Sequence, residues 1–248
     1  MSKKEIIKID DEKDVVNFLQ NPVPQIAKSL VGIFLGSGIR EWKHSLGRVI
    51  MAAFNKKNLL VQLGEEIKYY HDKKETKENY LSSNKNRESL YELLMFIDEE
   101  VPDEERFNAM KSIFLLSISK DATKEDEVLA YEFMQICKKL GSNDILILKA
   151  AFDIISRNFR KGVLKPDLDI TQAGSWFKAI ARQIGYSISE LVEQQEEYLV
   201  SLKLITKRQQ LPSHSTTKDT FFKSEYFRLT PLGYKLCEFI TKYEKIKK

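Results

Sequence analysis

Two stretches near the C-terminal end decide the fold, FKAIARQIGYSISELVEQQEEYLVSLKLI (Phe177–Ile205) and FRLTPLGYKLCEFI (Phe227–Ile240). In the first, apolar residues recur at the three- and four-residue steps of helices on both sides of a Gly185-Tyr186-Ser187 turn. This spacing predicts one helix over about 176–184 and a second over about 188–202.

The residues around these helices complete a regular order of elements. LITKRQ (Leu204–Gln209) predicts a strand, and FFKSEYFRLT (Phe221–Thr230) predicts its partner across the polar segment LPSHSTTKD. A helix from Asp144 to about Arg160 comes before, and Thr230-Pro231 starts a last helix that runs through Ile240. Over about residues 142 to 245, this order resembles the winged helix-turn-helix domains of bacterial regulators.

The rest of the chain predicts a mainly α protein. Residues 1–22 are polar and are followed by Pro22-Val23-Pro24, residues 23–141 carry helical periodicity with almost no strand signal, and residues 142–248 hold the winged-helix region. Thr123 and Asp126 form a capping box at one helix start. We therefore expect an N-terminal helical bundle followed by a winged helix with a small two-stranded wing.

The whole chain resembles a bacterial family associated with abortive infection, the Abi-alpha type. The similar stretches are SLVGIFLGSGIREWKHSLGRVI, VPDEERFNAMKSIFLLSIS, YEFMQICKKLGSNDILILKA and LTPLGYKLCEFI. The resemblance lies in the order of helices and carries no diagnostic motif. It implies a role in phage defence, without a defined reaction and without functional residues to carry over.

The second helix of the helix-turn-helix is acidic. Its four carboxylates are Glu190, Glu193, Glu196 and Glu197, and no Lys or Arg occurs between Gln183 and Leu202. A helix that enters the major groove meets closely spaced phosphates, so this charge opposes DNA binding. The four carboxylates predict a protein-interaction surface instead.

Cations gather after this helix. From Lys203 to Lys248 the chain has eleven basic and four acidic residues, within a total of 40 basic and 36 acidic residues. Any nucleic-acid contact is therefore expected from the wing and the basic tail. The candidate nucleic-acid-binding residues are Lys203, Lys207, Arg208, His214, Lys218, Lys223 and Arg228.

The glycine-spaced segment near the N-terminus has two readings. Gly32 and Gly36 lie four residues apart and so share one helix face. That face either packs tightly inside the bundle or, on the second reading, pairs with another subunit or lies on a membrane surface, and the pairing makes both glycines protein-interaction candidates. A membrane partner is not expected, because Ile26–Ile39 is shorter than the roughly twenty residues that a span needs.

Catalytic and metal chemistry are not predicted. The three histidines are far apart in sequence, and the chain contains no phosphate-loop, dinucleotide or nucleophile-elbow motif. Cys137 and Cys237 stand in apolar helical contexts typical of buried reduced thiols, so a cytoplasmic protein without cofactor is expected.

Our first hypothesis is a non-enzymatic bacterial protein that binds another macromolecule, with its winged helix serving mainly as a protein-interaction module. The partner is a second protein or another copy of the chain. The alternative is a DNA-binding transcriptional regulator that dimerises through its helical N-terminal region.

Overall fold

A computed structural model describes residues 57–99, 103–160, 173–209, 220–221 and 227–243. The protein is mainly helical, as expected. It divides into two compact units, of which the first comprises residues 1–102 and 114–134 and the second residues 103–113 and 135–248. The second unit therefore includes the whole region expected to form a winged helix.

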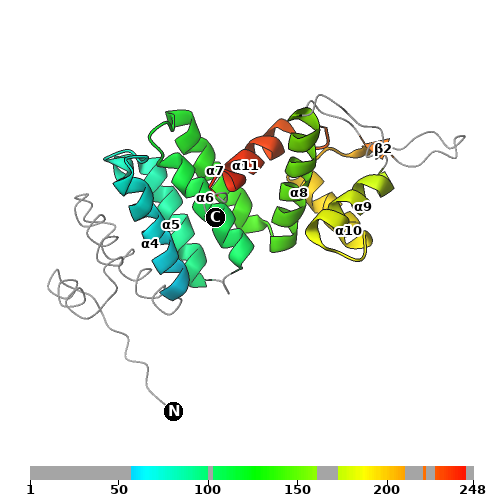
Figure 1. Cartoon of the computed structure of the whole chain (residues 1–248), viewed down its shortest axis with the longest axis horizontal. Coiled ribbons are helices and arrows are strands. Elements are labelled where there is room, and N and C mark those ends of the chain that lie inside the picture. The colour runs from blue at the N-terminus through cyan, green and yellow to red at the C-terminus, as the bar shows by residue number, and fades with distance from the viewer. Residues whose placement is uncertain (1–56, 100–102, 161–172, 210–219, 222–226, 244–248) are drawn as a thin grey trace, which may run out of the picture. The chain divides into compact units, whose positions relative to one another are not determined.

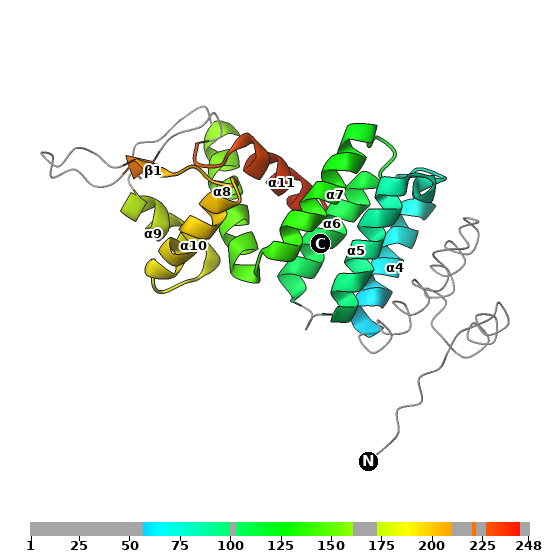
Figure 2. The same ribbon diagram turned by 180° about the vertical axis from the view of Figure 1, so that it is seen from behind.

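The first unit contains long helices joined by tight connections. Its helices are α4 (Lys57–Asp72), the 3-10 turn η2 (Tyr80–Ser82), α5 (Asn84–Glu99), the end of α6 (Glu104–Ser117) and most of α7 (Lys124–Lys139). Helices α4 and α5 lie side by side in both views (Figures 1 and 2). The connection after α4 pairs with the chain after α6 through an antiparallel bridge between Thr76 and Ser119.

Helix α5 begins inside a polar stretch of the chain. Residues 72–88 are mostly charged and polar, yet the helix already starts at Asn84. Asn86 is buried, and its side-chain amide donates a hydrogen bond to the Tyr80 carbonyl oxygen (2.9 Å). A buried amide with a backbone partner is stable in a helix, so this polar run does not end in a loop.

The expected capping box at the start of α7 is present. The Thr123 backbone N–H donates to the Asp126 carboxylate (2.9 Å), and the Asp126 backbone N–H donates to the Thr123 hydroxyl (3.1 Å). Each residue thus satisfies a donor that the first helical turn leaves without an intrahelical acceptor.

The second unit has the order of elements expected from the sequence. Its elements are α8 (Ser142–Arg160), α9 (Ala173–Ile184), α10 (Glu190–Ser201), β1 (Arg208–Gln209), β2 (Thr220–Phe221) and α11 (Pro231–Thr241). Helix α8 packs against α9, α10 and α11 (Figure 1). The strands form a short antiparallel ladder that pairs Arg208 with Phe221 and Gln209 with Thr220.

The turn between α9 and α10 depends on a glycine. Gly185 has a φ of +82°, in the left-handed region that L side chains rarely adopt. The Tyr186 backbone N–H then donates to the Ala181 carbonyl oxygen (2.8 Å), which closes the end of α9. The expected Gly185-Tyr186-Ser187 turn is therefore confirmed.

The segment Leu229–Gly233 fastens the start of α11 to the end of α10. The Thr230 hydroxyl caps α11 by accepting from the Gly233 N–H (3.0 Å), and it donates to the Lys203 carbonyl oxygen (2.6 Å). A Cβ added at Gly233 would lie 2.0 Å from the Leu204 carbonyl oxygen. Only glycine allows this close approach of the two backbones.

Both cysteines lie in the core of the second unit. Cys137 and Cys237 are buried and free, which confirms the expectation of buried thiols. Burial raises the pKa of the Cys137 thiol to about 12 and raises that of Cys237 as well. Neither thiol is a reactive thiolate at neutral pH.

Among the described helices, none is both long and apolar enough to cross a membrane. Residues 1–22, Ile26–Ile39 with Gly32 and Gly36, and the end of the basic tail lie outside the described residues.

Candidate interaction site

Helix α10 presents three different faces. Val192, Glu196 and Leu199 recur at helical steps and are all buried against the rest of the second unit. Two of the three are apolar, as a core-facing stripe requires, while the third is a carboxylate. A buried carboxylate needs a cationic partner, and that partner is found in the chain before α11.

The buried partner of Glu196 is Arg228. The Arg228 side chain is 0% exposed and that of Glu196 is 5% exposed, and an Arg228 guanidinium nitrogen pairs with the Glu196 carboxylate. Burial lowers the pKa of Arg228 to about 9, so the guanidinium still carries its charge at neutral pH. The rings of Trp176 and Phe177, each centred 5.9 Å from the guanidinium carbon, help to accommodate that charge.

A second arginine connects the strand ladder to the same helix. Arg208, in β1, donates through Nε to Glu196 (2.6 Å) and through Nη2 to Glu193 (2.6 Å). Its guanidinium carbon lies 4.9 Å from the centre of the Phe177 ring. The Arg208 and Glu193 side chains are 30% and 46% exposed, so this pair lies at the protein surface.

The remaining face of α10 is exposed, and the helix itself has no Lys or Arg, although the Tyr198 hydroxyl donates to the Lys139 carbonyl oxygen (2.6 Å). Leu191 and Tyr198 are seven residues apart, or two helical turns, and both are exposed large hydrophobic side chains. Ile188, just before the helix, is 52% exposed and Leu191 is 43% exposed. Glu190 and Glu197 are also exposed on this helix. The face thus combines apolar side chains with carboxylates.

Only two of the expected nucleic-acid contacts lie freely on the described surface. Lys203 and Lys207 are exposed, whereas Arg208 is ion-paired with two carboxylates. Arg228 corrects our expectation, because a fully buried guanidinium does not reach a phosphate. His214, Lys218 and Lys223 lie outside the described residues.

The expected acidic surface of α10 is smaller than the sequence predicts. Glu190, Glu193 and Glu197 are exposed, and Glu193 is paired with Arg208. Glu196 corrects our expectation, because it faces the core and pairs with both arginines. An intramolecular partner explains why a carboxylate occupies a core position.

Sequence reasoning missed the exposed apolar face and two further cations. Val192 and Leu199 belong to the apolar stripe of the helix that faces the core, whereas Leu191 and Tyr198 lie outside that stripe. Their position outside the stripe was the sequence signal that could have identified them as exposed. On α9, Lys178 and Arg182 lie one turn apart and are both exposed.

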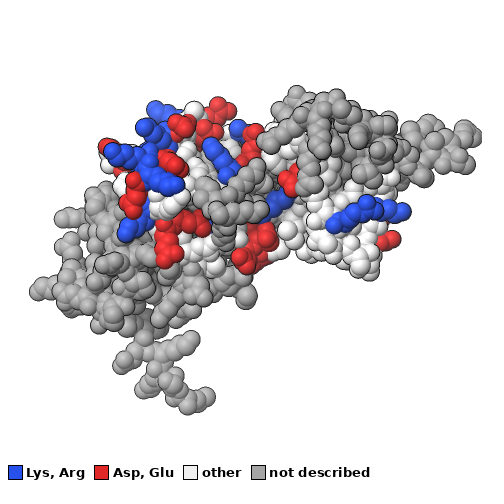
Figure 3. All heavy atoms as spheres, viewed as in Figure 1, with Lys and Arg blue, Asp and Glu red and all other residues white. Residues whose placement is uncertain are grey.

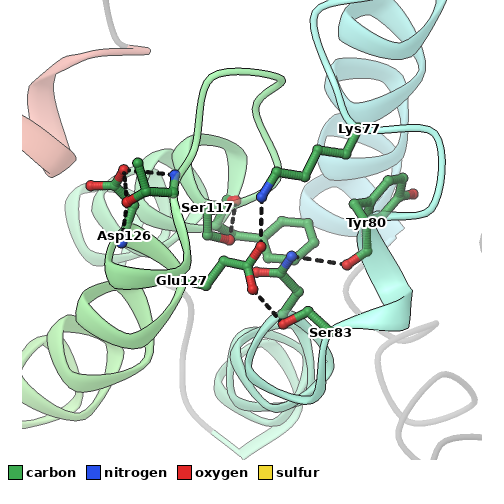
Figure 4. Close-up of polar contacts among 9 residues, drawn as sticks. Lys77, Tyr80, Ser83, Ser117, Asp126 and Glu127 are labelled. Atoms are coloured by element: carbon green, nitrogen blue, oxygen red, sulfur yellow. Dashed lines mark hydrogen bonds and ion pairs between the residues drawn. The ribbon is translucent and has the colours of Figure 1, made fainter.

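A separate polar cluster in the first unit has a structural explanation. The Glu127 carboxylate accepts from Lys77 Nζ and from the Ser83 hydroxyl, both at 2.6 Å (Figure 4). Burial alone would raise the pKa of Glu127, but the two hydrogen bonds and the nearby charges of Lys77 and Lys124 together lower the pKa below its usual value. The cluster fixes the segment before α5 against the first turn of α7.

The described surface of the first unit has mixed charge. On the face seen in Figure 3, basic and acidic side chains are interspersed over its helices. Such a surface is typical of a solvated face and does not form a single-sign patch for an anionic polymer. Within the described residues, no group of three His, Cys, Asp or Glu side chains is placed to hold a metal ion.

No protein-family model, curated protein or solved structure matches the chain.

Proposed function

We propose that α8 to α11, with the ladder between β1 and β2, form a winged helix whose second helix-turn-helix helix is α10. The proposal is supported by the order of the elements, by the left-handed Gly185 turn and by the antiparallel pairing of the strands. The attachment of Thr230 and Gly233 to the end of α10 also supports it, because it links the exit of the wing to that helix.

We further propose that the protein is non-enzymatic and binds another protein through the exposed face of α10. One observation carries this proposal. Exposed Leu191 and Tyr198 occur together with exposed Glu190 and Glu197 on a helix that has no Lys or Arg. Carboxylates in the position of a recognition helix would be repelled by the phosphates of a DNA complex, and the helix offers no Lys or Arg to offset them. The exposed apolar side chains suit a protein surface instead.

The charge of this face defines the chemistry of the partner. Glu190 and Glu197 are two turns apart, and they complement a partner that presents Lys or Arg side chains beside apolar ones. The alternative, a transcriptional regulator that reads DNA with α10, would require cations on this same face. The resemblance to the Abi-alpha family supports phage defence as the setting of the interaction.

Site-specific photo-crosslinking in cells tests this proposal. A photoreactive amino acid at Leu191 should give a discrete adduct with a partner. Reversing the charges by Glu190→Lys together with Glu197→Lys should strongly reduce the yield of that adduct, because the basic partner would be repelled.

The matched control is the same photoreactive group at Val128, an exposed aliphatic position on α7. We expect no comparable adduct from Val128. Equal yields from the two positions, or a yield from Leu191 that survives both charge reversals, would overturn the proposal that α10 is the binding face.

A further inference from the structure

The two arginines that meet α10 form ion pairs of different kinds. The pair between Glu196 and Arg228 is buried, with both side chains at most 5% exposed. The pair between Glu193 and Arg208 lies in contact with solvent. Arg208 also touches the buried carboxylate of Glu196, so it connects the inner pair to the outer one.

This arrangement lets Arg208 give up its contact with Glu193 at a low cost. If Arg208 turns outward, Glu196 keeps its charge partner in Arg228, and no buried carboxylate is left uncompensated. Glu193 is half-exposed and is solvated by water once its partner departs. Loss of an exposed pair costs little, because water and salt already screen it.

The guanidinium of Arg208 is also placed where it could bind another anion. Its guanidinium carbon lies over the Phe177 ring, 4.9 Å from the ring centre, in the range of a cation–π contact. The guanidinium presents two N–H groups to carboxylate oxygens, and the same planar fork fits phosphate oxygens. Exposed cations in the same unit, among them Lys178, Arg182 and Lys207, would support binding of a polyanion.

We propose that Arg208 is a phosphate-binding residue for a nucleic-acid backbone and that Glu193 competes with the phosphate for its guanidinium. While Arg208 is paired with Glu193, the proposed wing has a reduced affinity for nucleic acid. A phosphate that replaces the Glu193 carboxylate exchanges one anionic oxygen for another and leaves the pair between Glu196 and Arg228 intact.

Fluorescence anisotropy with the full chain and a labelled 20-base-pair DNA duplex tests this proposal. Glu193→Gln should tighten binding by about two- to fivefold, the range that corresponds to removing a competing exposed ion pair. The slope of log affinity against log salt should change by less than one, because Arg208 contacts the same phosphate with or without Glu193. Arg208→Gln should weaken binding and make the slope shallower.

A double-variant comparison separates competition from a general charge effect. In the Arg208→Gln background, Glu193→Gln should change the affinity little, because the residue released by Glu193 is gone. Glu197→Gln, which removes an equal charge from the same helix, should have a smaller effect than Glu193→Gln in the otherwise unchanged chain.

Three results of the duplex experiment would overturn the proposal. They are undetectable duplex binding at low salt in every variant, an effect of Glu193→Gln that persists without Arg208, and equal effects of Glu193→Gln and Glu197→Gln. Preferred binding of a labelled poly-glutamate peptide over the duplex would also overturn it, because the anion would then be a protein. None of these results depends on the photo-crosslink at Leu191, so the phosphate-binding proposal and the protein-binding proposal can fail separately.

Discussion

Gly233 occupies a position that no other residue can fill without a shift of backbone. The nearest atom to an added Cβ would be the Leu204 carbonyl oxygen at 2.0 Å, and a backbone atom cannot move away as a flexible side chain can. The closeness of the two backbones lets Thr230 cap α11 and donate to Lys203 in the same place.

Gly233→Ala should lower the free energy of unfolding by about 3 kcal/mol or more, as overpacking against rigid neighbours does. Denaturant unfolding followed by circular dichroism measures this change. Gly174→Ala is the matched control, because a Cβ there meets open space in the first turn of α9. It should be neutral or stabilising by up to about 1 kcal/mol. Equal losses in the two variants would contradict the packing explanation.

The contributions of Glu196 and Arg228 to the free energy of unfolding should depend strongly on each other. Either Glu196→Gln or Arg228→Met leaves one buried charge without its main partner and should cost about 3–5 kcal/mol. The double variant should cost much less than the sum of the two single losses, because it removes both charges together. Urea unfolding of the four proteins gives the coupling free energy, and strict additivity would show that the two residues act independently.

At the scale of the element, α10 shows what the sequence could predict and what it could not. The helix, its glycine turn and the following strand can be read from periodicity and from Gly185. The division of its four glutamates cannot, because their roles depend on Arg208 and Arg228, which lie 12 and 32 residues after Glu196. Long-range ion pairs have no local signal in the sequence, so a core carboxylate is easily taken for a surface one.

The same limit applies to the arginines and to the bounds of the helices. Arg228 counts as a basic residue in any sequence window, yet its place between Trp176 and Phe177 is a tertiary property. The early start of α5 at Asn84 depends on the buried contact of Asn86 with Tyr80. By contrast, the capping box of Thr123 and Asp126 is local and was predicted correctly.

The contact between Glu127 and the segment before α5 should make stability depend on acid pH. The folded-state pKa of Glu127 is lowered from 4.5, so its stabilisation is present above that value and is lost as the pH falls through the folded-state pKa. Glu127→Gln should be less stable than the unchanged protein at pH 7, and the difference should shrink toward pH 3. Urea midpoints at pH 7, 5 and 3 measure this.

The control for this experiment is Glu125→Gln, which changes an exposed carboxylate in the first turn of the same helix. Its difference from the unchanged protein should vary far less with pH. A constant deficit of Glu127→Gln from pH 7 to pH 3 would mean that Lys77 and Ser83 do not hold the ionised carboxylate.

At the scale of the whole molecule, both proposed binding surfaces lie in the second unit. Its buried ion pair between Glu196 and Arg228 fastens the residues just before α11 to α10, and so fixes which face of α10 is turned to the core. Leu191 and Tyr198 lie on the exposed face of α10 and Ile188 lies just before the helix, while exposed Lys178 and Arg182 lie on α9 and exposed Lys207 lies beside β1. The protein docking that we propose for α10 and the phosphate contact that we propose for Arg208 therefore involve different residues of one unit.

The chemical nature of the molecule that crosslinks at position 191 decides between a protein and a nucleic-acid partner of α10. We predict an adduct that nuclease leaves unchanged, because we propose that the exposed face of α10 docks on a protein. An adduct that nuclease removes would contradict this proposal and would place α10 on nucleic acid.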